Sequence, residues 1–239
     1  RLNVAVLKSY LDYHDIDIIP AKFKRKVKVP KLHKAKEEPI DSSDIRKILL
    51  ACNNRRLKTY DLVLASGGMR AVEGLAIRLK DIDFSTSPTK IHIRAEYAKT
   101  RVARDIYISD EATKYLQDLI NWKYRNDRPR SKGDLVFGVG RSEDPRGLYS
   151  ELSVEFIRTL DIAGFSERKD DSSRHKITLH SFRRFVDSTI TTEAGQDFAE
   201  WFLGHADNSY FSKKEHELRQ IYATKCMKYL TFLDYTVLE

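Results

Sequence analysis

Cysteine is scarce in this sequence of 239 residues. Its two cysteines, Cys52 and Cys226, are separated by most of the chain, which fits reduced thiols inside a cell better than a disulfide framework. Long apolar runs are also missing, because the stretch DLVLASGG at 61–68 ends far short of the ~20 apolar residues that a membrane-spanning helix needs. The first residues lack the basic flank, apolar block and cleavage site of a signal peptide. We therefore expect a soluble intracellular protein.

Patterns that bind metal ions are absent as well. No two histidines stand four residues apart, and no paired carboxylates lie near His180 or His205 in the sequence. Two cysteines so far apart also argue against a zinc knuckle. The sequence therefore predicts no bound metal.

Positive charge is in excess. The chain has 43 Lys and Arg against 35 Asp and Glu, which gives a net charge of +8. Residues 21–36, AKFKRKVKVPKLHKAK, hold basic side chains and no acid. A basic strip of this kind gains affinity for a polyanion by releasing counterions, whatever the base sequence. We predict that it contacts a polyanionic partner through Lys22, Lys24, Arg25, Lys26, Lys28 and Lys31.

The chain divides into three parts by pattern. Residues 1–14 carry a short apolar stripe at helical spacing, too short to support a domain, so we expect the last helix of a preceding domain. Residues 15–40 contain three prolines among alternating lysine and apolar residues, and we expect an extended basic linker. Residues 41–239 then form one larger domain.

Residues 41–239 show mainly helical patterns. Asp41 or Ser42 caps a first helix, a second runs from 56 to 66 and stops at Gly67 and Gly68, and a short third helix follows. Between 82 and 108 the period changes to the alternation typical of three antiparallel strands. Helical patterns return at 110–124, 149–163, 179–193, 196–203 and 213–230. The predicted fold class is α+β, mainly α, with one small three-stranded sheet.

Several motifs with polar residues follow one another along the chain. They are SGGMRAVEG around Arg70, YAKTRVAR around Lys99, LHSFRR with His180 and Arg183, and FLGH ending at His205. In this order they resemble the motifs of the tyrosine recombinases, the phage-integrase family, over residues 41 to the C-terminus. Arg104 matches the basic residue that closes the family's hairpin. The placement of a tyrosine after FLGH resembles that of archaeal integrases, so we expect an archaeal virus, plasmid or integrated element.

The resemblance implies a DNA recombinase that cuts one strand at a time through a 3′-phosphotyrosyl bond, without metal or cofactor. Its expected partners are double-stranded DNA attachment sites and further copies of the chain, as a tetramer on DNA, in the cytoplasm or nucleoid of a host cell. Two rivals remain open. One is a DNA-binding accessory protein on the same fold that no longer cuts, and the other is a type IB topoisomerase.

The residue types suit this chemistry. A phosphodiester attacked by a phenol gains negative charge, which preplaced cations stabilise, and a guanidinium offers a planar fork to two oxygens. Arg70 and Arg183 are candidates for that clamp. His180 lies three residues before Arg183 and shares its helix face, and Lys99 is a candidate general acid. His205 would donate a hydrogen bond to the phosphate.

Each residue also has a purely structural interpretation. Exposed Arg70 or Lys99 could be ordinary surface charge, His180 could bond the loop before its helix, and His205 could cap the preceding helix. We expect Glu73, one turn after Arg70, to orient an arginine rather than to act in catalysis.

The nucleophile is the hardest residue to place. The family usually has it about nine residues after the histidine of Leu-Gly-His, and here that position is Lys214. The candidates are Tyr210 and Tyr222. Tyr222 belongs to an apolar stripe at i+4 spacing that favours a core position, so Tyr210 is the preferred nucleophile and Tyr222 the alternative. The apolar residues near the C-terminus dock either on their own core or on a neighbouring protomer.

Overall fold

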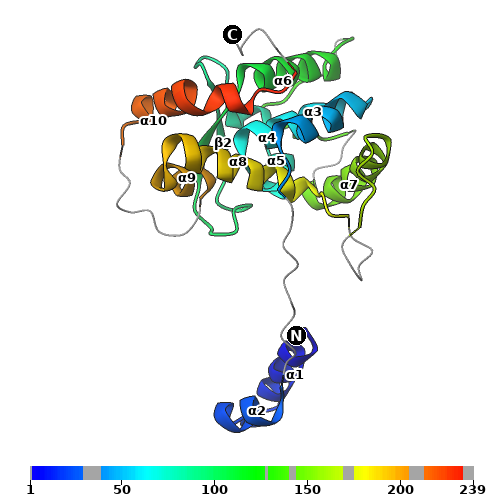
Figure 1. Ribbon diagram of the computed structural model, residues 1–239, viewed down its shortest axis with the longest axis vertical. Coiled ribbons are helices and arrows are strands. Elements are labelled where there is room, and N and C mark those ends of the chain that lie inside the picture. The colour runs from blue at the N-terminus through cyan, green and yellow to red at the C-terminus, as the bar shows by residue number, and fades with distance from the viewer. Residues whose placement is uncertain are drawn as a thin grey trace. The chain divides into compact units, whose positions relative to one another are not determined.

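The computed structural model describes residues 2–28, 39–126, 129–139, 144–168, 175–204 and 213–233. It consists of two compact units, residues 1–37 and 38–239 (Figure 1). His205, Tyr210 and Lys31 lie outside the described residues.

The first unit contains two helices, α1 (Leu2–Tyr13) and α2 (Pro20–Lys26). The prediction of an extended linker is wrong for residues 20–26. Pro20 occupies the first turn of α2, where its fixed φ is favourable. Backbone N–H groups in the first turn have no intrahelical acceptor, so the N–H that proline lacks costs no hydrogen bond. Lys24, Arg25 and Lys26 fill the last turn, where positive charge complements the helix dipole. The basic residues at 22, 24, 25, 26 and 28 are all exposed.

The second unit is mainly helical with one small sheet, which confirms the predicted fold class. Its α-helices are α3 (Ser42–Ala51), α4 (Arg55–Gly67), α5 (Ala71–Leu75), α6 (Asp110–Lys123), α7 (Pro145–Ile162), α8 (Leu179–Ala194), α9 (Gln196–Leu203) and α10 (Glu215–Ile221). Short helical turns lie at Leu79–Asp81, Tyr222–Cys226 and Met227–Leu230. The strands are β1 (Ile82–Asp83), β2 (Thr89–Ile93) and β3 (Arg104–Ile108).

The strands form an antiparallel sheet in the order β1-β2-β3. Ile91 pairs with Ile106, and Ile93 pairs with Arg104. The isoleucines at 91, 93, 106 and 108 are buried, and β3 packs against α4 and α9. One face of the sheet therefore belongs to the core, as the alternating pattern predicts.

Helix α4 runs through the middle of this unit and contacts α3, α5, α6, α7, α8 and β3 (Figure 1). Its residues from Tyr60 to Gly67 are all buried, as expected for a helix covered on every side. The helix ends where Gly68 adopts the left-handed conformation with φ of 61°. A Cβ atom at Gly68 would lie 2.7 Å from both Leu203 and Val186, so this end needs glycine for conformation and for space.

The last described residues pack on their own unit. Leu230 and Phe232 are buried. The backbone N–H groups of Phe232 and Leu233 donate to the Glu111 carboxylate at 2.8 and 2.6 Å. The chain thus docks on its own core as far as Leu233, and the apolar residues beyond it lie outside the described part. Within the described ranges, no helix is long and apolar enough to cross a membrane.

Candidate active site

Arg70 stands at the corner between α4 and α5. The Tyr60 hydroxyl donates to the Ala71 carbonyl at 2.7 Å, which fixes the corner from the side of α4. Glu73 then binds Arg70 twice, because it accepts from the backbone N–H at 2.9 Å and from the guanidinium Nη1 at 2.8 Å. The expected role of Glu73 as the orienting partner of an arginine is confirmed.

Glu73 also binds a second arginine. Arg104 begins β3, is 9% exposed, and donates from Nη2 to Glu73 Oε2 at 2.7 Å. Its Nε donates to the Phe202 carbonyl of α9 at 3.3 Å. Burial acts to raise the pKa of Glu73, but the hydrogen bonds and charges of Arg104 and Arg70 outweigh it. The pKa therefore lies below its ordinary value, and the carboxylate is ionised at neutral pH.

Arg183 on α8 brings a third guanidinium to this place. It is 4% exposed and donates to the carbonyls of Gly68 at 2.7 Å and Leu203 at 2.8 Å, which joins the ends of α4 and α9. Burial and the neighbouring charge of Arg70 lower its pKa to about 10, so it stays charged at neutral pH. We call Arg70, Arg104 and Arg183 with Glu73 the arginine cluster. Its three cations face one carboxylate, and the excess charge is positive.

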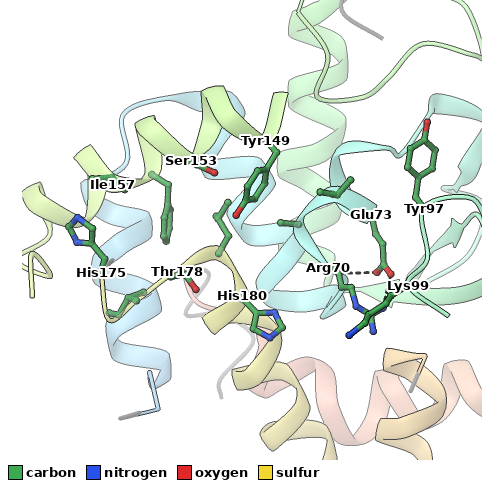
Figure 2. Close-up of a pocket in the computed structure, with 15 residues that line it drawn as sticks. Arg70, Glu73, Tyr97, Lys99, Tyr149, Ser153, Ile157, His175, Thr178 and His180 are labelled. Atoms are coloured by element: carbon green, nitrogen blue, oxygen red, sulfur yellow. Dashed lines mark hydrogen bonds and ion pairs between the residues drawn. The ribbon is translucent and has the colours of Figure 1, made fainter. Parts of the chain in front are cut away.

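A cavity of about 760 Å³ opens beside the cluster. Arg70 of the α4–α5 corner, Lys99 of the β2–β3 loop and His180 of α8 line it together (Figure 2). Three residues far apart in the sequence are thus brought to one site. Arg183 does not line the cavity, although it is only three residues from His180. It points inward to the two carbonyls.

His180 is the second residue of α8. Partial burial, followed by the charges of Arg183 and Arg70, lowers the pKa of its imidazole below the ordinary 6.5. The ring is therefore neutral at physiological pH and offers one donor and one acceptor nitrogen. Lys99, by contrast, is exposed and lies in the β2–β3 loop.

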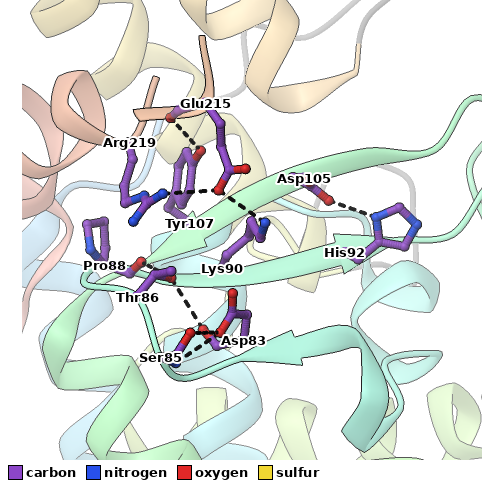
Figure 3. Close-up of polar contacts among 10 residues, drawn as sticks. All are labelled: Asp83, Ser85, Thr86, Pro88, Lys90, His92, Asp105, Tyr107, Glu215 and Arg219. Carbon is purple, nitrogen blue, oxygen red and sulfur yellow. Dashed lines mark hydrogen bonds and ion pairs between the residues drawn. The ribbon is translucent and has the colours of Figure 1, made fainter. Parts of the chain in front are cut away.

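The described residues on either side of His205 and Tyr210 are firmly held. Gly204 ends α9 in the left-handed conformation, and a Cβ atom there would lie 2.7 Å from the Arg104 side chain. Gly204, the last described residue before His205, therefore lies next to the arginine cluster. After Lys213 it returns as α10, whose first residue, Glu215, is fixed to the sheet (Figure 3).

Glu215 is held by its backbone and by its side chain. Its carbonyl accepts from the Tyr107 hydroxyl at 3.3 Å. Its carboxylate binds Lys90 and Arg219, each at 3.1 Å (Figure 3). The start of α10 is thus tied to β2 and β3.

Tyr222 is a core residue. Its ring stacks on Phe202 with an interplanar angle of 13°, and its hydroxyl donates to the Ser66 carbonyl at 3.0 Å. Burial raises its pKa well above the ordinary value for a phenol. A hydroxyl that is buried and already bonded is poorly placed to attack DNA. The packing position that its i+4 stripe predicts is confirmed.

Sequence patterns did not indicate the far side of the cavity. Tyr149, Ser153 and Ile157 of α7 and His175 line it (Figure 2). The three α7 residues are spaced at i, i+4 and i+8. This spacing predicts that they share a helix face, but it does not predict which part of the protein that face contacts. Across the part of the chain that the structure covers, no three His, Cys, Asp or Glu side chains are grouped to hold a metal ion.

Residues 38–217 match the model of the phage integrase family. The chain belongs to this family, the tyrosine recombinases. The resemblance seen in the motifs of Arg70, Lys99, His180 and Arg183 is thereby confirmed at the level of the family.

Two curated relatives of this tyrosine recombinase show how far the similarity extends. Transposase A from transposon Tn554 of Staphylococcus aureus is 24% identical over 223 residues, 82% of this chain and 58% of that protein. Tyrosine recombinase XerA of Saccharolobus solfataricus is 25% identical over 128 residues, 54% of this chain and 40% of that protein. The chain therefore spans about half the length of these relatives.

Solved structures share the fold. The crystal structure of XerA recombinase matches with a TM-score of 0.56 at 19% identity and covers 92% of this chain and 72% of that one. A lambda integrase tetramer bound to a Holliday junction matches with a TM-score of 0.56 at 16% identity, over 88% of this chain and 58% of that one.

Proposed function

We propose that this chain carries the catalytic domain of a site-specific DNA recombinase that breaks and rejoins strands through a 3′-phosphotyrosyl intermediate. One observation carries the proposal. Arg70, Lys99 and His180 line a single cavity beside a buried cluster with excess positive charge. Such a site is complementary to a phosphate that gains charge in the transition state.

The arginines form the phosphate clamp. Glu73 holds the Arg70 guanidinium in place, so little side-chain freedom is lost when a phosphate binds. Arg183 uses Nη1 and Nη2 on two carbonyls, but a guanidinium has five N–H groups, and its charge interacts with that of Arg70. Arg183 is buried, which suits a stabilising charge that water screens little.

The proton transfers follow from the remaining residues. The Tyr210 phenol oxygen attacks phosphorus while the neutral imidazole of His180 accepts the phenolic proton. The bond to the 5′ oxygen breaks, and Lys99 protonates that oxygen to give a free 5′-hydroxyl. His205 donates a hydrogen bond to the phosphate. Rejoining is the reverse reaction with the 5′-hydroxyl of a partner strand, and because the phosphodiester energy is kept in the tyrosyl ester, neither metal nor cofactor enters the scheme.

Strand exchange between two duplexes requires several active sites, and we propose a tetramer on DNA, as in the structure of similar fold in which a lambda integrase tetramer is bound to a Holliday junction. The exposed basic residues of α2, Lys22, Lys24, Arg25 and Lys26, together with Lys28 and Lys31, would contact the DNA backbone. The C-terminal segment beyond Leu233 is proposed to pack on a neighbouring protomer. An archaeal mobile element remains the proposed origin.

Covalent capture tests the chemistry. The full-length protein is incubated with a randomised pool of duplexes, each nicked so that the 5′-hydroxyl fragment is lost after cleavage, and adducts are isolated under denaturing conditions. Sequencing of the trapped DNA gives the site, and peptide mapping gives the tyrosine. We expect Tyr210→Phe to abolish the adduct.

Tyr222→Phe is the matched control, because it removes only the hydroxyl that donates to Ser66. We expect this variant to retain adduct formation. An adduct that survives Tyr210→Phe would refute the choice of nucleophile, and DNA binding with no adduct from wild-type protein would favour the non-cutting accessory protein. If the protein forms adducts and relaxes supercoiled DNA but does not join separate duplexes, a type IB topoisomerase would be indicated.

A further inference from the structure

The cavity beside the arginine cluster is much larger than a phosphate requires. One end carries Arg70, Lys99 and His180, which account for the phosphate (Figure 2). The other end, which we call the α7 end, is formed by α7 and by the residues that lead into α8. Its lining comprises Tyr149, Ser153, Phe156, Ile157, His175 and Ile177.

The α7 end is mainly apolar. Phe156 lines it and is 2% exposed, while Tyr149 and Ile157 present larger surfaces, 39% and 41% exposed. Because Tyr149, Ser153 and Ile157 repeat at i+4 along α7, the helix turns one continuous face toward the cavity. A flat aromatic group would find both an aromatic ring and aliphatic side chains there.

Two polar atoms in this wall lack hydrogen-bond partners. His175 is 7% exposed, and its Nδ1 atom is buried without a partner among the described residues. The same holds for the Ser153 Oγ atom. Buried polar groups are nearly always paired, so two unpaired atoms that belong to residues lining one cavity indicate a ligand toward which these side chains turn. His175 lies at the end of the cavity remote from Arg70 in Figure 2.

A nucleobase has the matching chemistry. Its faces are apolar and stack on aromatic side chains, while its edge carries donors and acceptors that a serine hydroxyl and an imidazole nitrogen can meet. Its sugar connects it to the phosphate bound at the cationic end of the same cavity. An apolar protein side chain would fill the space but leave His175 Nδ1 and Ser153 Oγ unpaired, so the two orphan atoms favour the base.

We propose that the α7 end accepts an unstacked base of a nucleotide next to the scissile phosphate. This inference rests on the proposed function, because that function places the phosphate beside Arg70 and His180. The base would lie against Ile157 and Tyr149, apart from the neighbouring bases of the duplex, and pair with Ser153 and His175 once their side chains turn toward the cavity. Extrusion of one base would also mark the cleavage position on a duplex.

The test uses 2-aminopurine, an adenine analogue whose fluorescence is quenched by stacking in a duplex. It is placed at each position on either side of the scissile phosphate in duplexes retained by full-length protein from the randomised pool. We expect fluorescence at one position to rise several-fold on binding. Ile157→Trp, which fills the α7 end, should abolish the rise. Ile162→Trp, on the same helix, 70% exposed and outside the cavity lining, should leave it unchanged.

Tyr149→Ala gives a second, independent variant, because it removes the side chain that would hold the base in the α7 end, at an exposed position where the fold tolerates truncation. The proposal is overturned if bound wild-type protein brings no rise at any position, or if the rise persists in both Ile157→Trp and Tyr149→Ala. Adduct yield on the same duplexes separates the two hypotheses. An adduct without a rise refutes the base pocket alone, and a rise without an adduct refutes the proposed chemistry while the pocket stands.

Discussion

Glu73 and Arg104 form a buried ion pair whose atoms Oε2 and Nη2 are 2.7 Å apart, with 1% and 6% of their side chains exposed. Glu73 belongs to the helix α5 that follows the Arg70 corner, whereas Arg104 begins a strand and reaches the end of α9. One carboxylate thus holds Arg70 in position and joins the corner to the sheet. Stability and site geometry depend on the same side chain.

Glu73→Gln should therefore unfold more easily than wild type. Loss of the carboxylate leaves the Arg104 charge buried without its counter-ion, and breaking a buried pair in this way costs about 3–5 kcal/mol. Urea denaturation measures the change. The double variant Glu73→Gln/Arg104→Met removes both charges and should recover part of the loss. If Glu73→Gln alone changed the free energy of unfolding by less than about 1 kcal/mol, the pair would stabilise the protein no more than a solvent-exposed ion pair does.

Sequence patterns predicted the helices and the sheet well where local chemistry decides the structure. Asp41 accepts from the Asp44 N–H as an N-cap, and Gly68 ends α4. Elsewhere the signal was weaker or misread. Pro20 starts a helix within a segment predicted to be extended, and α7 begins at Pro145, capped by Asp144, rather than at 149.

The site was only partly predictable for a different reason. The motifs identified Arg70, Lys99 and His180, and the structure brings them to one cavity. The inward turn of Arg183 depends on carbonyls of Gly68 and Leu203, which are distant in sequence. Similarly, the α7 end exists only because α7 packs near α5 and the start of α8, and periodicity within one helix does not specify its neighbour.

The pH dependence of cleavage should report on His180. Its pKa is lowered by burial and by Arg183 and Arg70, so the ring is neutral above a pKa that lies below 6.5 and protonated beneath it. In the proposed mechanism, the neutral ring accepts the phenolic proton. The single-turnover rate of adduct formation should therefore fall as the pH drops through that lowered pKa and be level above it. His180→Asn should show a low rate without this acidic limb, and a midpoint above 6.5 would contradict the assignment.

Asp61 should make the protein less stable as the pH rises. It is fully buried in α4, its two carboxylate oxygens have no hydrogen-bond partner among the described residues, and burial raises its pKa well above 3.8. A raised pKa means that the folded state keeps the proton when the unfolded chain releases it, so the stabilising contribution is complete below the unfolded pKa and is lost as pH rises through the folded one. Asp61→Asn should remove this dependence.

Urea denaturation of wild type and Asp61→Asn at about pH 5 and about pH 8 provides the comparison. The variant should gain stability relative to wild type at the higher pH, because an amide of similar shape needs no proton to stay neutral. Asp118→Asn on α6 is a control at an exposed carboxylate. Equal pH dependence of wild type and Asp61→Asn would show that Asp61 is ionised in the folded protein.

Gly68→Ala should be strongly destabilising, because it meets two separate obstacles. A residue with a Cβ atom at φ of 61° loses roughly 1–2 kcal/mol of conformational energy. The same Cβ would approach Leu203 and Val186 to 2.7 Å, and such overpacking costs about 1–3 kcal/mol more. Gly164→Ala is the matched control, since its φ is 85° but nothing lies within 4 Å of the added atom. Chemical denaturation should show a clearly greater loss for Gly68→Ala, because only there does the backbone strain combine with a clash. Equal losses would mean that Leu203 and Val186 move aside freely, and the α4–α8–α9 junction that carries Arg183 would then be less rigid than its packing indicates.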